Sequence, residues 1–390
     1  MSTTIAIGFS SENDPLTAFK EAAVMAKAQS GLTKHDLVVI TTTPSYTALG
    51  HPNSLQALES LRKVLNPEKL IGLPAPALIW TKGIENKGVL VLAISSDDID
   101  FGIAAENSLS LMPLQDTGLK LARELASRMS NSERHGAIIF CDALALNHTQ
   151  IIRGLHEGLG RAFIMAGAIN PGGMFLQENL LTDIIGGIIF GGKTSFAAAI
   201  RHGWQPLGKP RIIDDSNSNL IRTIDGKPAV SIYQEYFPED MASLPAGQLG
   251  DIGFLYPLGL STARAKEYII KSPSGILPDG SLICQGDIPH GTQVHLMIGD
   301  KDSCRKAAHD AAVEVHDKLH GKHPKLVFIF ASLSRKKLFG RSAGQEISQI
   351  KEILGLACPV FGMYTYGELG AVTSMDLQTH NAGILIAAIG

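Results

Sequence analysis

Three short apolar runs, rich in β-branched and aromatic residues, stand out along the chain. They are residues 37–40 (LVVI), 137–140 (AIIF) and 326–330 (LVFIF). Unbroken apolar runs of this length are typical of strands buried on both faces of a sheet. Each run therefore predicts the central strand of a buried sheet.

The same elements surround each of these runs in the same order. A segment with helical apolar spacing precedes the run, and a short apolar segment precedes that helix. A second predicted helix follows the run, then a segment containing glycine, then another apolar strand. The first helices are residues 15–29, 118–129 and 303–319, and the strands before them are 5–9, 109–112 and 294–298. The second helices are 54–65, 150–159 and 345–354, the glycine segments 70–72, 164–167 and 360–362, and the closing strands 89–94, 195–200 and 383–389.

This order of elements indicates an internal repeat. We expect an α/β protein of three diverged β-α-β-α-β-β units with mixed sheets, spanning residues 3–96, 107–200 and 292–390. Residues 201–290 break the pattern with Gly, Pro and Asp turn signals. They predict a β/turn segment inserted between the second and third units, with a helix near 232–236. The alternative is that any α/β protein looks self-similar at this level, since few residues are identical between the units.

The composition narrows the function classes. Apolar residues make up 45% of the chain and charged residues 18%, which is typical of a well-packed globular protein. The net charge of −3 argues against nucleic acid and anionic membranes as partners. The four cysteines lie far apart, so they predict neither a zinc site nor a disulfide framework. Since neither a signal-peptide pattern nor an apolar segment of roughly 18 residues is recognisable, we expect a cytoplasmic protein.

Two motifs match ligand sites but have simpler interpretations. Residues 187–194 match the phosphate-loop pattern G-x-x-x-x-G-K-[ST], yet bulky apolar residues stand where that loop should bend. We predict a hairpin turn at 191–193 instead. His316 and His320 have the spacing of metal ligands on a helix, but acidic and basic neighbours indicate a solvated face. We therefore predict no metal site.

The densest polar cluster in apolar surroundings lies at residues 362–370 (GMYTYGELG). On an extended strand Tyr364 and Tyr366 face the same side, and their rings combine apolar area with a polar tip, which suits a ligand pocket. The flanking glycines allow close approach of the backbone. The alternative is a tyrosine-bearing hairpin whose hydroxyl groups are satisfied. The candidate ligand-binding residues of this region are Gly362, Tyr364, Tyr366, Gly367, Glu368, His380 and Asn381.

The same region carries a resemblance to a known family. The C-terminal half of the chain resembles that of FIST proteins, and the end of its N-terminal half resembles the corresponding FIST segment. The C-terminal runs are 330–335 (FASLSR), 338–340 (LFG), 359–368 (PVFGMYTYGE) and 380–381 (HN). The upstream runs are 202–208 (HGWQPLG) and 224–229 (IDGKPA), followed by Tyr233.

The resemblance implies a FIST N-terminal half over residues 1–228 and a FIST C-terminal half over residues 229–390. It implies a sensory domain that binds small molecules, with amino acids proposed as ligands, and with haem and nitric oxide in some members. FIST domains often work with signalling proteins such as histidine kinases or diguanylate cyclases. Since no such output domain is recognisable in this sequence, we expect a stand-alone sensor that acts through a separate partner.

Three hypotheses follow, and the first is favoured. In a ligand sensor, Tyr364 and Tyr366 wall the pocket, Glu368 pairs with a ligand donor, and Arg335 clamps a carboxylate with its planar fork. The second is a haem-binding nitric-oxide sensor, for which the 13 histidines supply candidate ligands. The third is an enzyme that uses the Tyr/Glu/His cluster for acid–base chemistry on a small metabolite. No catalytic residue is assigned, and ligand, partner and oligomeric state stay open.

Overall fold

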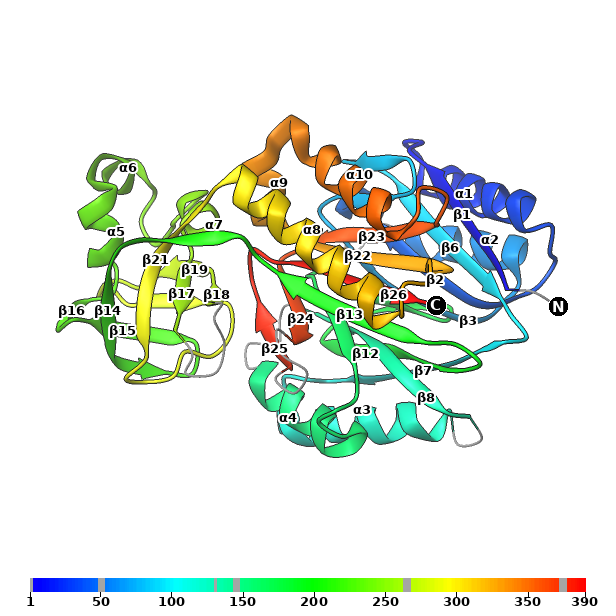
Figure 1. The fold of residues 1–390 in the computed structure, drawn as a ribbon, viewed down its shortest axis with the longest axis horizontal. Coiled ribbons are helices and arrows are strands. Elements are labelled where there is room, and N and C mark those ends of the chain that lie inside the picture. The colour runs from blue at the N-terminus through cyan, green and yellow to red at the C-terminus, as the bar shows by residue number, and fades with distance from the viewer. Residues whose placement is uncertain (1–2, 48–52, 130–131, 143–147, 262–267, 372–376) are drawn as a thin grey trace.

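The computed structural model describes residues 3–47, 53–129, 132–142, 148–261, 268–371 and 377–390. These parts of the chain form three six-stranded sheets and one eight-stranded sheet (Figure 1). Each six-stranded sheet contains one parallel pair of strands among antiparallel neighbours. The predicted α/β class with mixed sheets is therefore confirmed. No helix within the described ranges is long and apolar enough to cross a membrane.

Each sheet combines strands from distant parts of the chain. Across the first sheet, the strands follow one another as β1 (Thr4–Ser10), β6 (Val89–Ser95), β2 (His35–Thr42), β3 (Pro67–Pro74), β10 (Met174–Leu176) and β11 (Asn179–Leu181). Across the second they are β25 (Leu377–His380), β24 (Gly367–Ala371), β9 (Met165–Ile169), β8 (Arg134–Cys141), β12 (Ile184–Gly192) and β7 (Ile99–Asn107). Across the third they are β13 (Phe196–Arg201), β26 (Ile384–Ile389), β22 (Leu326–Ser332), β23 (Val360–Thr365), β4 (Leu78–Trp80) and β5 (Gly83–Glu85). The eight-stranded sheet contains β18 (Ile269–Lys271), β17 (Leu258–Leu260), β21 (Gln293–Gly299), β14 (Trp204–Asn217), β15 (Leu220–Ile224), β20 (Leu282–Cys284) and β19 (Pro273–Ile276), with β16 (Lys227–Pro228) paired to β15.

Helices cover one face of each six-stranded sheet. They are α1 (Pro15–Ser30) and α2 (Ser54–Leu65) on the first, α3 (Leu114–Ser127) and α4 (His148–Leu159) on the second, and α8 (Lys301–Lys318) and α10 (Ala343–Leu354) on the third. The shorter helices are α5 (Ser231–Tyr236), α6 (Pro238–Ser243), α7 (Ile252–Leu255), α9 (Leu333–Phe339), η1 (Pro44–Tyr46) and η2 (Gly340–Ser342). The helix predicted near 232–236 is thus confirmed as α5.

The repeat is visible in the order of the strands. Four consecutive positions read β1-β6-β2-β3 in the first sheet, β7-β12-β8-β9 in the second and β13-β26-β22-β23 in the third. In each case the last two strands form the parallel pair. The three units are therefore copies of one topology, as the sequence predicted.

The limits of the second and third units differ from the prediction. The second unit begins with β7, whereas residues 109–112 form a turn, in which Leu111 is 81% exposed. Its apolar residues predicted a strand there, but three of the four residues, Ser110, Leu111 and Met112, are exposed. The predicted closing strand at 195–200 is β13, which pairs with β26 in the third sheet, and the predicted strand at 294–298 is β21 of the eight-stranded sheet. The insertion thus interrupts the third unit after its first strand.

The hairpin predicted at residues 191–193 is wrong. These residues connect β12 of the second sheet to β13 of the third, and β12 pairs with β7 and β8 instead.

Hairpins exchanged between units tie the three sheets together. The hairpin β4–β5 of the first unit pairs with β23 of the third, and β10–β11 of the second pairs with β3 of the first. The hairpin β24–β25 of the third unit pairs with β9 of the second. The exchange closes a ring of three units. Their inner faces share one apolar core, in which the rings of Phe140 and Phe330 from two different units meet edge to face at 6.3 Å.

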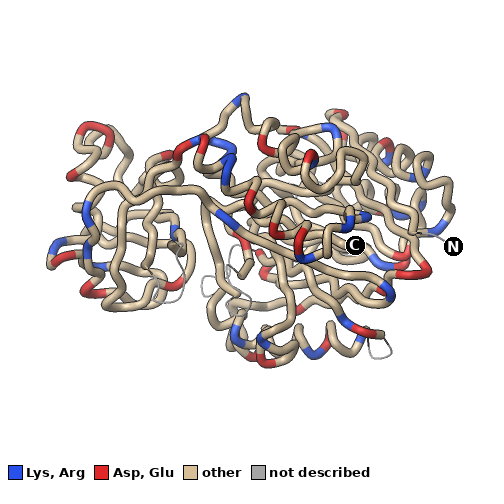
Figure 2. The backbone as a smooth tube through the Cα atoms, in the orientation of Figure 1, with Lys and Arg blue, Asp and Glu red and all other residues tan. Residues whose placement is uncertain are grey.

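The eight-stranded sheet and helices α5 to α7 form a lobe at one end of the molecule (Figure 1). Strands β14 and β21 lead into it and out of it. Acidic and basic residues are mixed over the whole backbone, and no large region of one sign stands out (Figure 2). The lobe packs against the ring of three units on the side of α4, β24 and β25, and the cavities described below lie at this junction.

One glycine occupies the same place in every unit. Gly72, Gly167 and Gly362 each pair with an isoleucine of the neighbouring parallel strand, and a Cβ added at any of them would overlap that isoleucine's carbonyl oxygen. We expect Gly362→Ala to lower the free energy of unfolding by about 1–3 kcal/mol, because the strands must move apart. Urea unfolding measures the change. Gly344→Ala in α10, where no atom lies within 4 Å of the added carbon, is the control and should stabilise slightly. Equal effects of the two changes would contradict the close-approach role.

Candidate functional site

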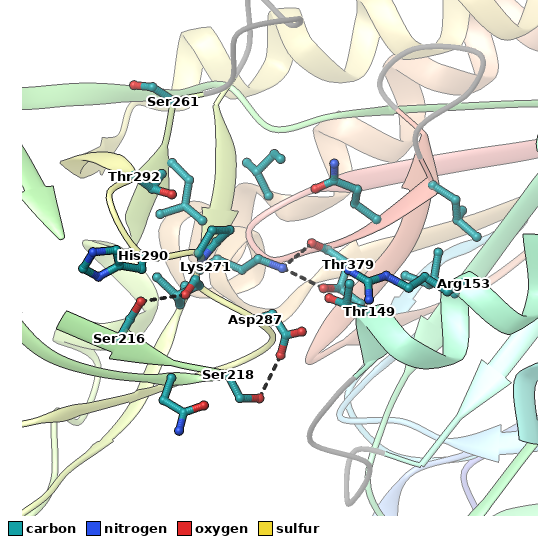
Figure 3. A pocket seen from close by; sticks show the side chains of 18 of the residues that line it. Thr149, Arg153, Ser216, Ser218, Ser261, Lys271, Asp287, His290, Thr292 and Thr379 are labelled. Carbon is teal, nitrogen blue, oxygen red and sulfur yellow. Dashed lines mark hydrogen bonds between the residues drawn. The ribbon is translucent and has the colours of Figure 1, made fainter. Parts of the chain in front are cut away.

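A cavity of about 760 Å³ lies between α4, β25 and the lobe (Figure 3). Its polar lining comes from three separate parts of the chain. Those residues are Thr149, Arg153, His156 and Arg161 on and after α4, Gln378 and Thr379 on β25, and Ser216, Asn217, Ser218, Ser261, Lys271, Asp287, His290 and Thr292 in the lobe. The size falls within the range of pockets that bind small molecules. We call it the charged cavity.

Lys271 is the most unusual residue of this cavity. Its side chain is 4% exposed, and its Nζ donates hydrogen bonds to the carbonyl oxygen of Thr379 at 2.8 Å and to its Oγ1 at 2.7 Å (Figure 3). Burial lowers the pKa of Lys271 to about 8, although Asp287 and Cys284 act in the opposite direction. A buried lysine at a cavity wall is costly to fold, so it is a sign of a binding function.

The charges around the cavity are unequal. Arg153 and Arg161 on the α4 side make no ion pair with any described residue, and Lys271 adds a third cation. Asp287 is the one carboxylate of the described lining, and it accepts a hydrogen bond from Ser218 Oγ at 3.0 Å. The excess of positive charge favours a ligand with a carboxylate or another anionic group. Asp287 offers a partner for an ammonium group.

A second cavity, of about 170 Å³, adjoins the first. We call it the small cavity. It is lined by His148, Ile169, Pro171, Ser274, Cys284, Gln285, Gly286, Tyr366, Gly367, Thr379 and Asn381. Thr379 belongs to both linings, and Lys271 Nζ hydrogen-bonds it. Three of the eight candidate residues, Tyr366, Gly367 and Asn381, are thus brought together here.

The side chain of Asn381 mainly forms hydrogen bonds within the junction between the third unit and the lobe. Its Nδ2 donates to Gln285 Oε1 at 2.7 Å and to the carbonyl of Tyr366 at 2.9 Å, and its Oδ1 accepts from the Ser272 amide at 3.0 Å. Its side-chain hydrogen bonds therefore connect the third unit to the lobe.

The two tyrosines do not wall one pocket together. Tyr364 is completely buried in the core between the third sheet and its helices, and its hydroxyl has no hydrogen-bond partner in the described structure. Tyr366 lies between β23 and β24, where the chain leaves one sheet for another. The strand prediction failed here because it assumed one continuous strand across residues 362–370. Gly362 likewise serves the approach of β23 to β22 and lines neither cavity.

Arg335 has a protein carboxylate as its partner. It is completely buried, and Nε and one terminal nitrogen bind Glu346 on α10. The remaining donors reach the carbonyl oxygens of Cys304 at 2.7 Å, His202 at 2.5 Å and Ala382 at 3.5 Å. All five N–H donors of the guanidinium are thus used within the protein. The prediction that Arg335 clamps a ligand carboxylate does not fit this geometry.

Glu368 and His380 face each other across the ladder of β24 and β25, away from both cavities. Burial raises the pKa of Glu368 to about 8 and lowers the pKa of His380 to about 3. Both side chains are therefore mainly uncharged at neutral pH. Neither Glu368 nor Tyr364 lines the charged cavity or the small cavity, so the acid–base cluster predicted for an enzyme does not converge on either of these two spaces.

Haem and metal sites both need ligand side chains such as histidine, either at a cavity of sufficient size or in a cluster of ligands. Nε2 of His148 lies at the small cavity without a hydrogen-bond partner among the described residues. The volume of about 170 Å³ is less than ordinary ligand pockets provide, so this cavity does not fit haem. Among the described residues no group of three or more His, Cys, Asp or Glu side chains could hold a metal ion. Haem binding stays a prediction, and uptake of hemin with a Soret band is its test.

The residues of the charged cavity were missed at the sequence level. Lys271 and Asp287 fall in the segment interpreted as turns, and Arg153 falls on a helix with no distinguishing motif. No local signal marks Lys271 as buried, because a lysine at the end of the apolar run YIIK is also what a strand that ends in solvent shows.

Comparison with known proteins supports the resemblance. The family model of the FIST N domain matches residues 36–227, and that of the FIST C domain matches residues 229–371. The border between them lies in β16, so strands from both matched ranges build the lobe. An uncharacterized protein of Mycobacterium tuberculosis (strain CDC 1551 / Oshkosh) is 20% identical over 384 residues, which is 95% of each chain. Another, from strain ATCC 25618 / H37Rv, is 21% identical over 397 residues, covering 97% of this chain and 96% of the relative.

Solved structures are similar only at a low level. Cyanuric acid hydrolase from A. caulinodans aligns with 100% of this chain and 99% of its own at a TM-score of 0.41 and 9% identity. PurLQS from Thermotoga maritima aligns with 100% of this chain and 72% of its own at a TM-score of 0.25 and 8% identity. Neither likeness carries an argument about function. The matches to both family models extend over most of the sequence, and the chain therefore belongs to the FIST family of small-ligand sensory domains.

Proposed function

We propose that the protein is a stand-alone sensor whose charged cavity binds a small amino acid or a closely related metabolite. The observation that carries the proposal is the buried Lys271 in a cavity of about 760 Å³. The other charged groups of its described lining are Asp287 and two arginines, Arg153 and Arg161, which make no ion pair with a described residue. An α-carboxylate would lie toward Lys271 and Arg153, and an α-ammonium group toward Asp287. Charge-assisted hydrogen bonds of this kind are the strong ones in proteins.

The position of the cavity offers a way to signal. Arg153 belongs to the second unit, whereas Lys271 and Asp287 belong to the lobe. A ligand that contacts both sides would favour the arrangement in which lobe and ring are close, since a ligand shifts an equilibrium by its differential affinity for the two states. A separate protein, such as a histidine kinase or a diguanylate cyclase, would read that change. Its activity, measured with and without this protein and the ligand, tests this part of the proposal.

A thermal-shift screen of amino acids and their deaminated analogues tests the ligand. A true ligand at 100 times its Kd should stabilise the protein by about 2.7 kcal/mol. Arg153→Gln and Lys271→Met should weaken binding of each hit about tenfold or more, because each removes a charge-assisted bond. Arg123→Gln on α3, an exposed arginine outside both cavities, is the matched control and should leave Kd unchanged.

The role of Asp287 gives a sharper comparison. Asp287→Asn should weaken the binding of an amino acid about tenfold. Binding of the matching carboxylic acid without an amino group should stay nearly unchanged, because only the amino acid has an ammonium group for Asp287 to bind. Isothermal titration measures both. Hits whose affinity is the same in all three variants would place the ligand elsewhere.

A further inference from the structure

The small cavity has the size of a single ring. Its volume of about 170 Å³ is close to that of an engineered cavity of about 150 Å³ that binds benzene. Much of its lining is apolar or aromatic, from Ile169, Pro171, Cys284 and Tyr366. It is bounded by the second unit, the hairpin segment of the third unit and the lobe, so all three must be folded for it to exist.

His148 presents an unpaired polar atom at this cavity. The residue is 8% exposed, it lines the cavity, and its Nε2 is buried without a hydrogen-bond partner in the described structure. Burial lowers the pKa of His148 to about 4, and the nearby charge of Lys271 acts in the same direction, so the ring is neutral at pH 7. A buried polar atom without a partner destabilises the folded protein, and a ligand that donates a hydrogen bond to it removes that penalty.

Other polar groups around the cavity are already engaged. Asn381 and Gln285 bond each other, Thr379 accepts from Lys271, and the Ser274 hydroxyl donates to the carbonyl of Ile283 at 3.2 Å. Cys284 is buried, and burial raises its pKa to about 12, so it stays a thiol. No charged side chain belongs to the described lining, which disfavours an ionic ligand.

We propose that the small cavity is a second ligand site, distinct from the charged cavity, for an uncharged molecule of single-ring size whose hydroxyl or N–H group hydrogen-bonds Nε2 of His148. The apolar walls hold the ring and His148 sets its orientation. The site needs no ligand in the charged cavity, so it does not rest on the function proposed above.

The probe is 4-fluorophenol, observed by ¹⁹F NMR with the full-length protein, and 4-fluorotoluene is the matched compound without a hydroxyl group. We expect saturable binding of 4-fluorophenol and at least tenfold weaker binding of 4-fluorotoluene. His148→Leu should remove this preference, so that the two compounds bind alike. Amino acids that bind the charged cavity should not displace 4-fluorophenol.

A second variant tests the small cavity without changing a buried residue. Ser274 is exposed at the edge of the cavity, so Ser274→Trp should obstruct entry without disturbing the fold and abolish binding of both compounds. Ser348→Trp, at an exposed position on α10, is the control and should bind as the wild type does. The proposal is overturned if 4-fluorophenol does not bind the wild type, or if it binds equally well to Ser274→Trp and retains its preference in His148→Leu.

Discussion

Replacement of Glu346 by alanine is expected to lower the free energy of unfolding by about 3–5 kcal/mol, the range seen when one partner of a buried ion pair is removed. Both side chains of the pair with Arg335 have no exposed surface. Without Glu346 the guanidinium keeps its charge, because arginine does not lose its proton in proteins. Among the described residues, the buried charge then keeps only carbonyl oxygens as hydrogen-bond acceptors.

Arg335 should stabilise the protein through more than its ion pair with Glu346. Arg335 also bonds the carbonyl of His202, where the chain leaves β13 for the lobe, and the carbonyl of Cys304 in α8. Its guanidinium lies 5.9 Å from the ring centroids of both Trp204 and Phe339, so cation–π attraction to these rings is lost as well when Arg335 is replaced. Arg335→Leu should therefore be at least as destabilising as Glu346→Ala.

Equilibrium unfolding in urea measures both changes. The double variant Arg335→Leu/Glu346→Ala should be less destabilised than the sum of the two single variants, because it buries no unpaired charge. Lys63→Ala, which breaks the exposed pair of Lys63 with Glu59, is the control and should cost less than about 1 kcal/mol. A Glu346→Ala variant as stable as this control would contradict the structural role, and the assignment of Arg335 as a ligand clamp would return.

The partner of Arg335 shows what the sequence could have indicated. Glu346 stands on α10 in the same stripe as Ala343, Ile347 and Ile350, all of which are buried. A carboxylate in the apolar stripe of an amphipathic helix predicts a buried cation, and Arg335 eleven residues earlier was available. The family resemblance favoured a ligand carboxylate as the partner of Arg335, whereas the helical pattern indicates Glu346.

Other features depend on contacts that no local pattern contains. The central strands β2, β8 and β22 were predicted because burial on both faces leaves a continuous apolar run. The exchange of hairpins was not, since β4 pairs with a strand more than 280 residues away through backbone hydrogen bonds that any sequence can make. The charged cavity was missed for the same reason. Arg153 and Lys271 become neighbours only when the lobe packs against α4.

The buried carboxyl of Glu368 is expected to make stability fall as the pH rises. Its Oε1 lies 2.5 Å from Thr365 Oγ1, and its Oε2 accepts from the Gly383 amide at 3.2 Å. Thr365 Oγ1 also lies 3.2 Å from the carbonyl of Ala331. One hydroxyl proton cannot serve both acceptors, so the arrangement is satisfied when Thr365 donates to Ala331 and a protonated Glu368 donates to Thr365.

The direction of the pH effect follows from the two pKa values. Burial raises the pKa of Glu368 from about 4.5 to about 8 in the folded protein. Between these values the unfolded chain loses the proton and the folded chain keeps it. The contribution of the proton to stability is therefore complete below pH 4.5 and is lost as the pH rises to about 8. The slope is roughly 1.4 kcal/mol per pH unit for one proton, or several kcal/mol in all.

Glu368→Gln should remove this dependence, because a glutamine amide can donate to Thr365 and accept from Gly383 as the protonated carboxyl does. The difference in unfolding free energy between variant and wild type should grow in favour of the variant from pH 5 to pH 8. Buried His148, His202 and His380, whose pKa values burial lowers, also make stability depend on pH, but they are common to both proteins and cancel in the difference. Glu352→Gln, an exposed change on α10, should show no such trend. A constant difference between Glu368→Gln and wild type across this range would show that Glu368 is ionised in the folded protein, and that Thr365 is then the donor to its carboxylate.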